Sequence, residues 1–233
     1  MMTLIILPGM DGTGLLLEPF ISALGPDFNV KVVRYPASEA LGYSGLEALA
    51  RSALPEQGPF LILGESFSGP VAVSLAASCP ARLKGVILCA SFVRNPRPGL
   101  AWLKPFIRVL PVASAPMAAL SYLLFGTASS SAMRSALTQA LALLPASTLK
   151  ARLRALLEID VSGKLAALTV PILYLRATHD RAVPRTAAQL VAQLNPQARI
   201  VPIEAPHFLL QAAPADASRA VADFARALQN EAG

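Results

Sequence analysis

Residues 60–72 read FLILGESFSGPVA, an apolar run that ends in a small–x–Ser–x–small segment before a helix-like stretch. Such a turn brings the strand and helix backbones close together, so small residues are needed on both sides of its serine. Gly64 and Ser68 occupy these positions, and Pro70 falls in the first helical turn, where a missing N–H is tolerated. The pattern favours a nucleophile elbow that lifts the Ser66 hydroxyl above a sheet. A serine that only caps a helix is the alternative.

Similar apolar runs recur on both sides of this stretch. Most are continuous rather than alternating, which is typical of parallel strands buried on both faces. Helix-like stretches separate them, so the sequence predicts an α/β fold with a doubly wound, mostly parallel sheet of about six strands. The expected strands are residues 3–7, 30–34, 60–63, 86–89, 172–175 and 199–201, and the expected helices are residues 15–24, 46–54, 67–78, 186–194 and 215–229.

The alternation of strands and helices stops between residues 92 and 160. This segment is rich in Ala, Leu, Pro and Ser and shows helical spacing, since Leu149, Leu153 and Leu156 fall on one helical face. We expect it to form a helical cap, here called the cap segment, inserted into a single domain whose core is residues 1–91 and 161–233. Such an insertion would cover the carboxyl edge of the sheet, where ligands bind in open α/β folds.

The composition excludes several classes of protein. Hydrophobic residues make up 54% of the 233 residues and charged residues 15%, which excludes an intrinsically disordered chain. The formal net charge is +6, but the basic residues are scattered and no aromatic residues interleave them, so we expect no nucleic-acid partner. Two cysteines and two histidines exclude a disulfide scaffold, a four-cysteine site and a multi-histidine metal site. We expect neither a metal nor an organic cofactor.

A membrane-spanning segment is not expected. The N-terminus lacks the basic start and long apolar stretch of a signal peptide. Residues 109–133 carry no charge, but Pro111, Pro116 and Gly126 interrupt them. The sequence therefore predicts a soluble cytoplasmic protein without stable membrane insertion, and contact of this stretch with a membrane surface stays open.

The candidates for a catalytic base and its carboxylate can be enumerated. A serine nucleophile needs a base, and the base needs a carboxylate that orients it. His207 follows the last expected strand and gives the order Ser–Asp–His along the chain, whereas His179 is the alternative base or a structural residue. Asp180 comes directly after a strand and lies on a different loop from His207, which makes it the preferred orienting acid. The four acids between Ser66 and His207 are Glu158, Asp160, Asp180 and Glu204.

A glycine-rich loop follows the first expected strand, in the sequence LIILPGMDGTG at residues 4–14. The loop lacks the lysine of a phosphate-binding P-loop and the spacing of a dinucleotide site. In a serine hydrolase, a loop at this position supplies an amide of the oxyanion hole. We expect the N–H groups of Met10 and Phe67 to fill that role, and a flexible turn without a role is the alternative.

Four ordered motifs together resemble those of the α/β-hydrolase superfamily, and in particular a small bacterial serine esterase with a helical cap. They are the oxyanion loop PGM at 8–10, the elbow GESFSG at 64–69, the acid loop DRAVP at 180–184 and the histidine loop PHF at 206–208. The chain departs from the family pattern in lacking the N-terminal hairpin. Pro8 also replaces the histidine of the oxyanion loop, and Ser68 replaces the second glycine of the elbow.

The resemblance and the residues together imply a serine hydrolase that cleaves carboxylic esters of a small or medium acyl chain. In this reading Ser66, His207 and Asp180 form the triad, and an acyl-enzyme is the intermediate. A thioesterase or acyltransferase with the same triad, including one acting on an acyl carrier protein, is the alternative, and a non-catalytic binding protein is a remote one. The oligomeric state stays open. The residues expected to line an acyl pocket are Trp102, Phe106, Leu120 and Leu124, and those that could steer an anionic substrate are Arg94, Arg97, Lys104 and Arg108.

Overall fold

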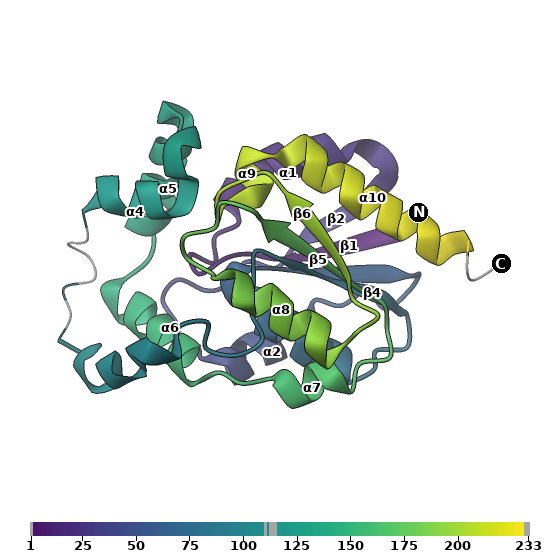
Figure 1. Cartoon of the computed structure of the whole chain (residues 1–233), viewed down its shortest axis with the longest axis horizontal. Helices are drawn as coiled ribbons and strands as arrows, with labels where there is room; N and C mark the ends of the chain where they lie inside the picture. The colour runs from purple at the N-terminus through teal and green to yellow at the C-terminus, as the bar shows by residue number, and fades with distance from the viewer. Residues whose placement is uncertain (1, 110, 112–115, 231–233) are drawn as a thin grey trace.

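A computed structural model describes residues 2–109, 111 and 116–230 of the chain (Figure 1). Its centre is a six-stranded sheet in the order β2-β1-β3-β4-β5-β6, and all five neighbouring pairs are parallel. The predicted doubly wound sheet of about six strands is thereby confirmed. The strands are β1 Met2–Leu7, β2 Phe28–Val32, β3 Phe60–Glu65, β4 Leu83–Cys89, β5 Ile172–Ala177 and β6 Arg199–Ile203.

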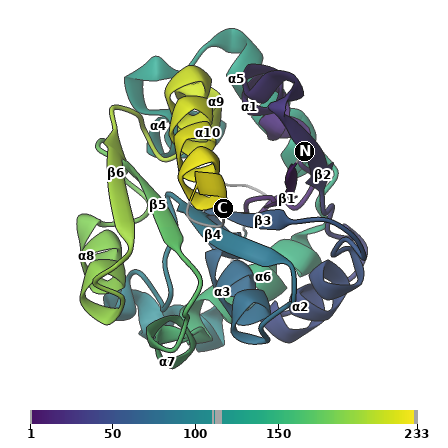
Figure 2. The ribbon, with the colours of Figure 1, turned by 90° about the vertical axis from the view of Figure 1, so that its right-hand side faces the viewer.

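Helices cover both faces of the sheet, as the view along the strands in Figure 2 shows. Successive β1 residues alternate between the two faces: Leu4 and Ile6 pack into one core cluster, and Ile5 and Leu7 into the other. Both clusters are apolar, which explains why the strands read as continuous apolar runs. The helices of the first face are α1 Glu18–Leu24, α9 Leu209–Ala212 and α10 Pro214–Asn230, and those of the second are α2 Tyr43–Ser52, α3 Gly69–Ala77, α7 Ser162–Ala166 and α8 Arg185–Leu194.

The strand order places a crevice above β1 and β3. The chain leaves β1 toward β2 at one side and then returns to β3 on the other side of β1. Loops that follow two such strands diverge, and ligands of open α/β sheets bind at this switch point. The loop after β1 and the turn after β3 both lie there.

Most element boundaries differ from the sequence prediction by one to three residues, and two of these differences have a clear physical cause. The expected helix at 15–24 is divided into a 3₁₀ turn η1 Leu15–Leu17 and α1, because Pro19 is tolerated only in the first turn of a helix. Strand β2 begins at Phe28 rather than residue 30, since the buried Phe28 ring already packs into the core where the 3₁₀ turn η2 Gly25–Asp27 ends.

The cap segment is helical, and its helices lie beyond the end of the sheet, opposite the two chain termini (Figure 1). Within the described part of this segment, the only β pairing is an isolated bridge between Arg94 and Asp160. Residues 110 and 112–115 of the uncharged stretch 109–133 lie outside the described residues. No helix in the described ranges is long and apolar enough to cross a membrane. The helices of the segment are η4 Pro98–Phe106, α4 Met117–Phe125, η6 Gly126–Ala128, α5 Ser131–Ala142 and α6 Ala146–Glu158.

Candidate active site

The turn after β3 holds Ser66 in a conformation that few side chains adopt. Strand β3 ends at Glu65, and Ser66 begins the 3₁₀ turn η3 Ser66–Ser68 with a positive φ of 47°. A Cβ on Gly64 would lie 2.7 Å from the carbonyl oxygen of Ser68, and one on Gly69 would lie 1.9 Å from Ser91 Oγ. The strand and helix backbones therefore meet at Gly64, as the small residue of the motif predicted, and the absence of a side chain at Gly69 leaves room for the Ser91 side chain.

A chain of hydrogen bonds joins Ser66, His207 and Asp180. Ser66 Oγ lies 2.8 Å from His207 Nε2, and His207 Nδ1 lies 2.8 Å from Asp180 Oδ2. The other carboxylate oxygen, Asp180 Oδ1, accepts from the backbone N–H groups of Ala182 and Val183, each at 2.8 Å. The side chains of His207 and Asp180 are only 4% and 7% exposed. The acid loop thus fixes the carboxylate, and the carboxylate fixes the imidazole ring.

The other histidine and acids considered from the sequence lie elsewhere. His179 Nε2 faces Glu204 Oε1 at 3.5 Å, and these two side chains are 60% and 89% exposed. Glu158 pairs with Lys104 at 2.6 Å. Asp160 Oδ1 accepts the Ser162 N–H. None of these groups forms a hydrogen bond or an ion pair with Ser66 or His207.

The two residues predicted to supply oxyanion amides are each anchored through their carbonyl groups. The Met10 carbonyl accepts from Arg152 Nη1 at 2.8 Å, and the Phe67 carbonyl accepts from the Tyr43 hydroxyl at 3.0 Å. The Phe67 ring also stacks on Tyr43, with ring centroids 4.7 Å apart. Over the described ranges, the Met10 N–H has no hydrogen-bond acceptor in the protein.

Arg152 is a buried cation that the sequence analysis did not single out. It projects from α6 with no exposed surface and donates to three backbone carbonyls: Met10 at 2.8 Å, Asp11 at 2.9 Å and Pro36 at 3.2 Å. Burial lowers the pKa of Arg152, and the nearby Asp11 carboxylate opposes that shift. The side chain ties the cap segment to the loop after β1. Arg152 lies four residues after Thr148 on the buried face of α6, and the polar residue types at these two positions gave no signal of that burial in the sequence.

Glu65 is a second group whose environment the sequence did not reveal. Its carboxylate accepts from the Gly9 N–H at 3.1 Å and from Gln211 Nε2 at 2.9 Å, and it is 4% exposed. Burial is the main cause that raises the pKa of Glu65 to about 7. Glu65 thus holds the loop after β1 from the sheet side, while Arg152 holds it from the cap segment.

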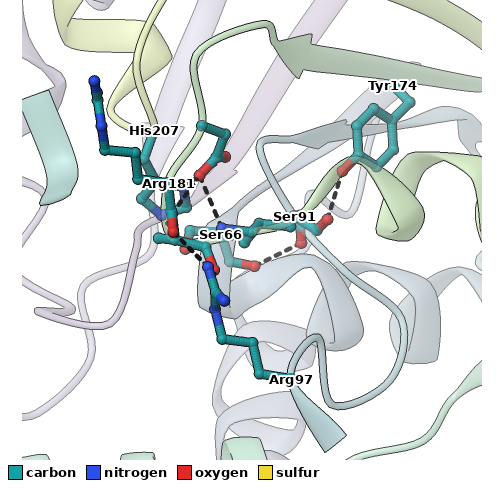
Figure 3. A network of polar contacts seen from close by, with 9 residues as sticks. Ser66, Ser91, Arg97, Tyr174, Arg181 and His207 are labelled. Atoms are coloured by element: carbon teal, nitrogen blue, oxygen red, sulfur yellow. Dashed lines mark hydrogen bonds and ion pairs between the residues drawn. The ribbon is translucent and has the colours of Figure 1, made fainter. Parts of the chain in front are cut away.

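Further polar contacts support the nucleophile turn, as Figure 3 shows. Ser91 Oγ donates to the Ser66 carbonyl at 2.5 Å, and the Tyr174 hydroxyl donates to the Ser91 carbonyl at 2.5 Å. Arg97 from the cap segment reaches the acid loop, where its guanidinium donates to the carbonyls of Arg181 at 2.5 Å and Ala182 at 3.1 Å. The cap segment therefore contacts both loops that flank Ser66. The sequence analysis named Arg97 among four basic residues that could steer an anionic substrate. In the structure its guanidinium instead donates hydrogen bonds to backbone carbonyls.

The four residues predicted to line an acyl pocket fall into two groups. Leu120 and Leu124 pack against a cluster that contains Phe125 and Phe208, and the Leu124 carbonyl accepts the Phe208 N–H at 3.0 Å. Phe208 follows His207 directly, with ring centroids 5.8 Å apart, so this apolar cluster borders the hydrogen-bonded chain. Trp102 and Phe106, by contrast, lie on the outer surface of η4 and are 65% and 52% exposed.

Metal-ligating side chains do not gather in threes anywhere in the described ranges. The polar side chains near Ser66 are instead hydrogen-bonded to one another, from Asp180 through His207 to the Ser66 hydroxyl. Such a chain can take a proton from a serine hydroxyl and return it to a leaving group.

Comparison with known proteins places this arrangement in a family. Among curated proteins, the phytyl ester synthase 1 of Arabidopsis thaliana is 33% identical over 118 residues, which are 47% of this chain and 16% of that much longer protein. Three solved structures share the fold at low identity.

A carboxylesterase of Nitrososphaera gargenis has a TM-score of 0.81 at 14% identity, with 98% of this chain and 91% of that chain covered. A bromoperoxidase of Bacillus anthracis has a TM-score of 0.80 at 17% identity, with 97% of this chain and 91% of that chain covered. A putative aryl esterase of Burkholderia cenocepacia has a TM-score of 0.75 at 18% identity, with 98% of this chain and 91% of that chain covered. The model of the alpha/beta hydrolase family matches residues 4–224, and the chain therefore belongs to that family.

Proposed function

We propose that this protein is a serine hydrolase that cleaves carboxylic esters of a small or medium acyl chain through an acyl-enzyme. The observation that supports this most directly is the continuous chain Ser66–His207–Asp180, with both links at 2.8 Å. The positive φ of Ser66 adds support, since a nucleophile elbow holds its serine in this way.

In the proposed mechanism, His207 Nε2 takes the Ser66 proton as Oγ attacks the acyl carbonyl carbon. The negative charge that develops on the carbonyl oxygen is stabilised by the N–H groups of Met10 and Phe67. Asp180 holds the Nδ1–H of His207 and stabilises the imidazolium, which then protonates the leaving alcohol. Water, activated by His207, releases the acid and restores Ser66.

An acyltransferase is the second candidate, because the partial relative from Arabidopsis is named an ester synthase. The chemistry differs only in the group that attacks the acyl-enzyme, an alcohol in place of water. Leu120, Leu124 and Phe208 beside His207 form an apolar border that suits an acyl chain or a long alcohol. A thioester donor, including an acyl carrier protein as a partner, fits the same triad, and a cytoplasmic location is part of the proposal.

The test compares purified wild-type protein with Ser66→Ala on p-nitrophenyl esters of increasing acyl length. The substitution should lower kcat/KM by at least about a thousandfold. Ser22→Ala serves as the control, since Ser22 is an exposed serine of α1. A fluorophosphonate should label wild-type protein at Ser66 and leave Ser66→Ala unlabelled. Adding a long-chain alcohol and measuring new ester separates transfer from hydrolysis. Unchanged turnover in Ser66→Ala would refute the proposed function.

A further inference from the structure

A basic pocket lies on the cap segment between η4 and α6. Its volume is about 300 Å³, and no acidic residue of the described part of the chain lines it. Four of its lining side chains are cationic: Lys104 on η4, Arg108 just after it, and Lys150 and Arg154 on α6. The pocket is separate from the hydrogen-bonded chain at Ser66, and nothing in the proposed mechanism uses it.

The positive charge of this pocket is only partly compensated. Glu158 Oε1 contacts Lys104 Nζ at 2.6 Å and Arg154 Nε at 3.3 Å. Lys150 Nζ donates to the Arg108 carbonyl at 2.8 Å. Over the residues that the structure describes, no carboxylate pairs with the charged groups of Arg108 or Lys150. One carboxylate against four cations leaves an excess of three positive charges, which favours an anionic ligand.

Large apolar side chains stand exposed beside these charges. Trp102, Phe106 and Val109 are 65%, 52% and 77% exposed, and the Trp102 and Phe106 rings contact each other edge to face at 6.3 Å. Lys104 lies between the two aromatic residues along η4. A single exposed apolar residue is ordinary, but three within eight positions beside a basic pocket are not. Aromatic residues next to lysine and arginine are typical of surfaces that enter a lipid headgroup layer.

We propose that this face of the cap segment docks on a lipid surface that carries anionic headgroups. The basic pocket would bind a headgroup phosphate, and Trp102, Phe106 and Val109 would enter the boundary between headgroups and acyl chains. An acidic protein could satisfy the four cations, but it would not bury a projecting Trp–Phe pair unless it also offered an apolar recess. Charge and apolar exposure together therefore favour the lipid. The proposal does not depend on the proposed hydrolase function.

Trp102 makes the first test direct, because it is the single tryptophan of the chain. Vesicles of phosphatidylcholine mixed with phosphatidylglycerol should shift its fluorescence to the blue and bring the protein down on sedimentation. Vesicles of phosphatidylcholine alone should do neither. Added salt should reverse the binding, because the attraction to the headgroups is screened.

Two pairs of substitutions separate the basic pocket from overall charge. Arg108→Gln with Lys150→Gln should lower vesicle partitioning by roughly 25-fold, at about fivefold for each basic side chain near an anionic leaflet. Arg219→Gln with Arg226→Gln on α10 changes the net charge equally, from +6 to +4, and should lower it by less than about threefold. Phe106→Ser should lower it by about tenfold. Circular dichroism and melting curves verify that each variant is folded.

The vesicle experiments give results that either support or refute lipid docking. A blue shift with anionic vesicles that depends on Arg108 and Lys150 supports lipid docking. The proposal is wrong if the vesicles leave Trp102 unchanged or if the α10 pair lowers binding as much as the pocket pair. It is also wrong if glycerol phosphate or an acidic acyl carrier protein binds through Arg108 and Lys150 while vesicles do not, since the pocket would then serve a soluble anion or a protein.

Discussion

Replacing Arg152 by Met should loosen the loop after β1 while keeping a buried side chain of similar length. The guanidinium donates to three carbonyls, those of Met10, Asp11 and Pro36, at 2.8 to 3.2 Å. Hydrogen bonds from a charged donor contribute about 1.5–3 kcal/mol each. Removal of the buried charge returns part of its desolvation cost, which is several kcal/mol. We therefore expect the free energy of unfolding to fall by about 2–4 kcal/mol.

Thr148→Val is the matched comparison for this change. Thr148 lies one turn earlier on α6 and donates to the Ala37 carbonyl at 2.7 Å, so its loss removes one neutral hydrogen bond to the segment after β2 and none to the loop after β1. It should cost about 1 kcal/mol. Urea denaturation followed by circular dichroism measures both values.

Ester hydrolysis supplies the second readout. Since Arg152 binds the Met10 carbonyl, Arg152→Met should displace the Met10 amide and lower kcat about 10- to 100-fold, with KM little changed. Thr148→Val should leave kcat within about twofold. Equal losses of stability in the two variants, or a wild-type kcat in Arg152→Met, would refute the reasoning.

Two further predictions concern the turn after β3. Burial raises the pKa of Glu65 from 4.5 to about 7. Between these pH values the folded protein therefore binds more protons than the unfolded chain. The free energy of unfolding should fall by roughly 3 kcal/mol as the pH rises through that window. Glu65→Gln should remove this slope; urea midpoints of both proteins from pH 4 to 8 test it, and parallel curves would contradict it. Gly69→Ala would place a Cβ 1.9 Å from Ser91 Oγ and should lower stability by about 1–3 kcal/mol. Gly163→Ala in α7 is the control, because nothing lies within 4 Å of the added Cβ. It should leave stability unchanged or raise it by up to about 1 kcal/mol. Equal melting temperatures for the two alanine variants would count against the close approach at Gly69.

The fold and the Ser66–His207–Asp180 chain were predictable from the sequence. The strands are marked by local apolar runs, and few residues could serve as the catalytic base or acid. Continuous apolar runs specify parallel strands, and a chain with two histidines leaves little choice of partner for Ser66. Enumeration brought together Ser66, His207 and Asp180, and the structure places their polar atoms in hydrogen-bond contact.

The supporting contacts were not predictable because their partners are distant in sequence. Arg152 binds carbonyls 116 to 142 residues away, and an arginine in an exposed-looking helix reads as a surface charge. Glu65 fills the variable position of its motif, which says nothing about burial. Trp102 and Phe106 were expected to face inward on apolarity alone, and apolarity does not tell which side of a short 3₁₀ helix meets the core.

The double attachment of the loop after β1 bears on how this protein could be recombined with its relatives. In a transplanted cap segment that had no arginine at the position of Arg152, the carbonyls of Met10 and Asp11 would lose their donor. Gly12 would meanwhile keep a backbone shaped for that missing side chain, since a Cβ there would lie 2.7 Å from Arg152 Nη1. The cap segment therefore cannot be exchanged independently of the loop after β1. Chimaeras should carry the loop and α6 from the same parent, so that a crossover never separates them.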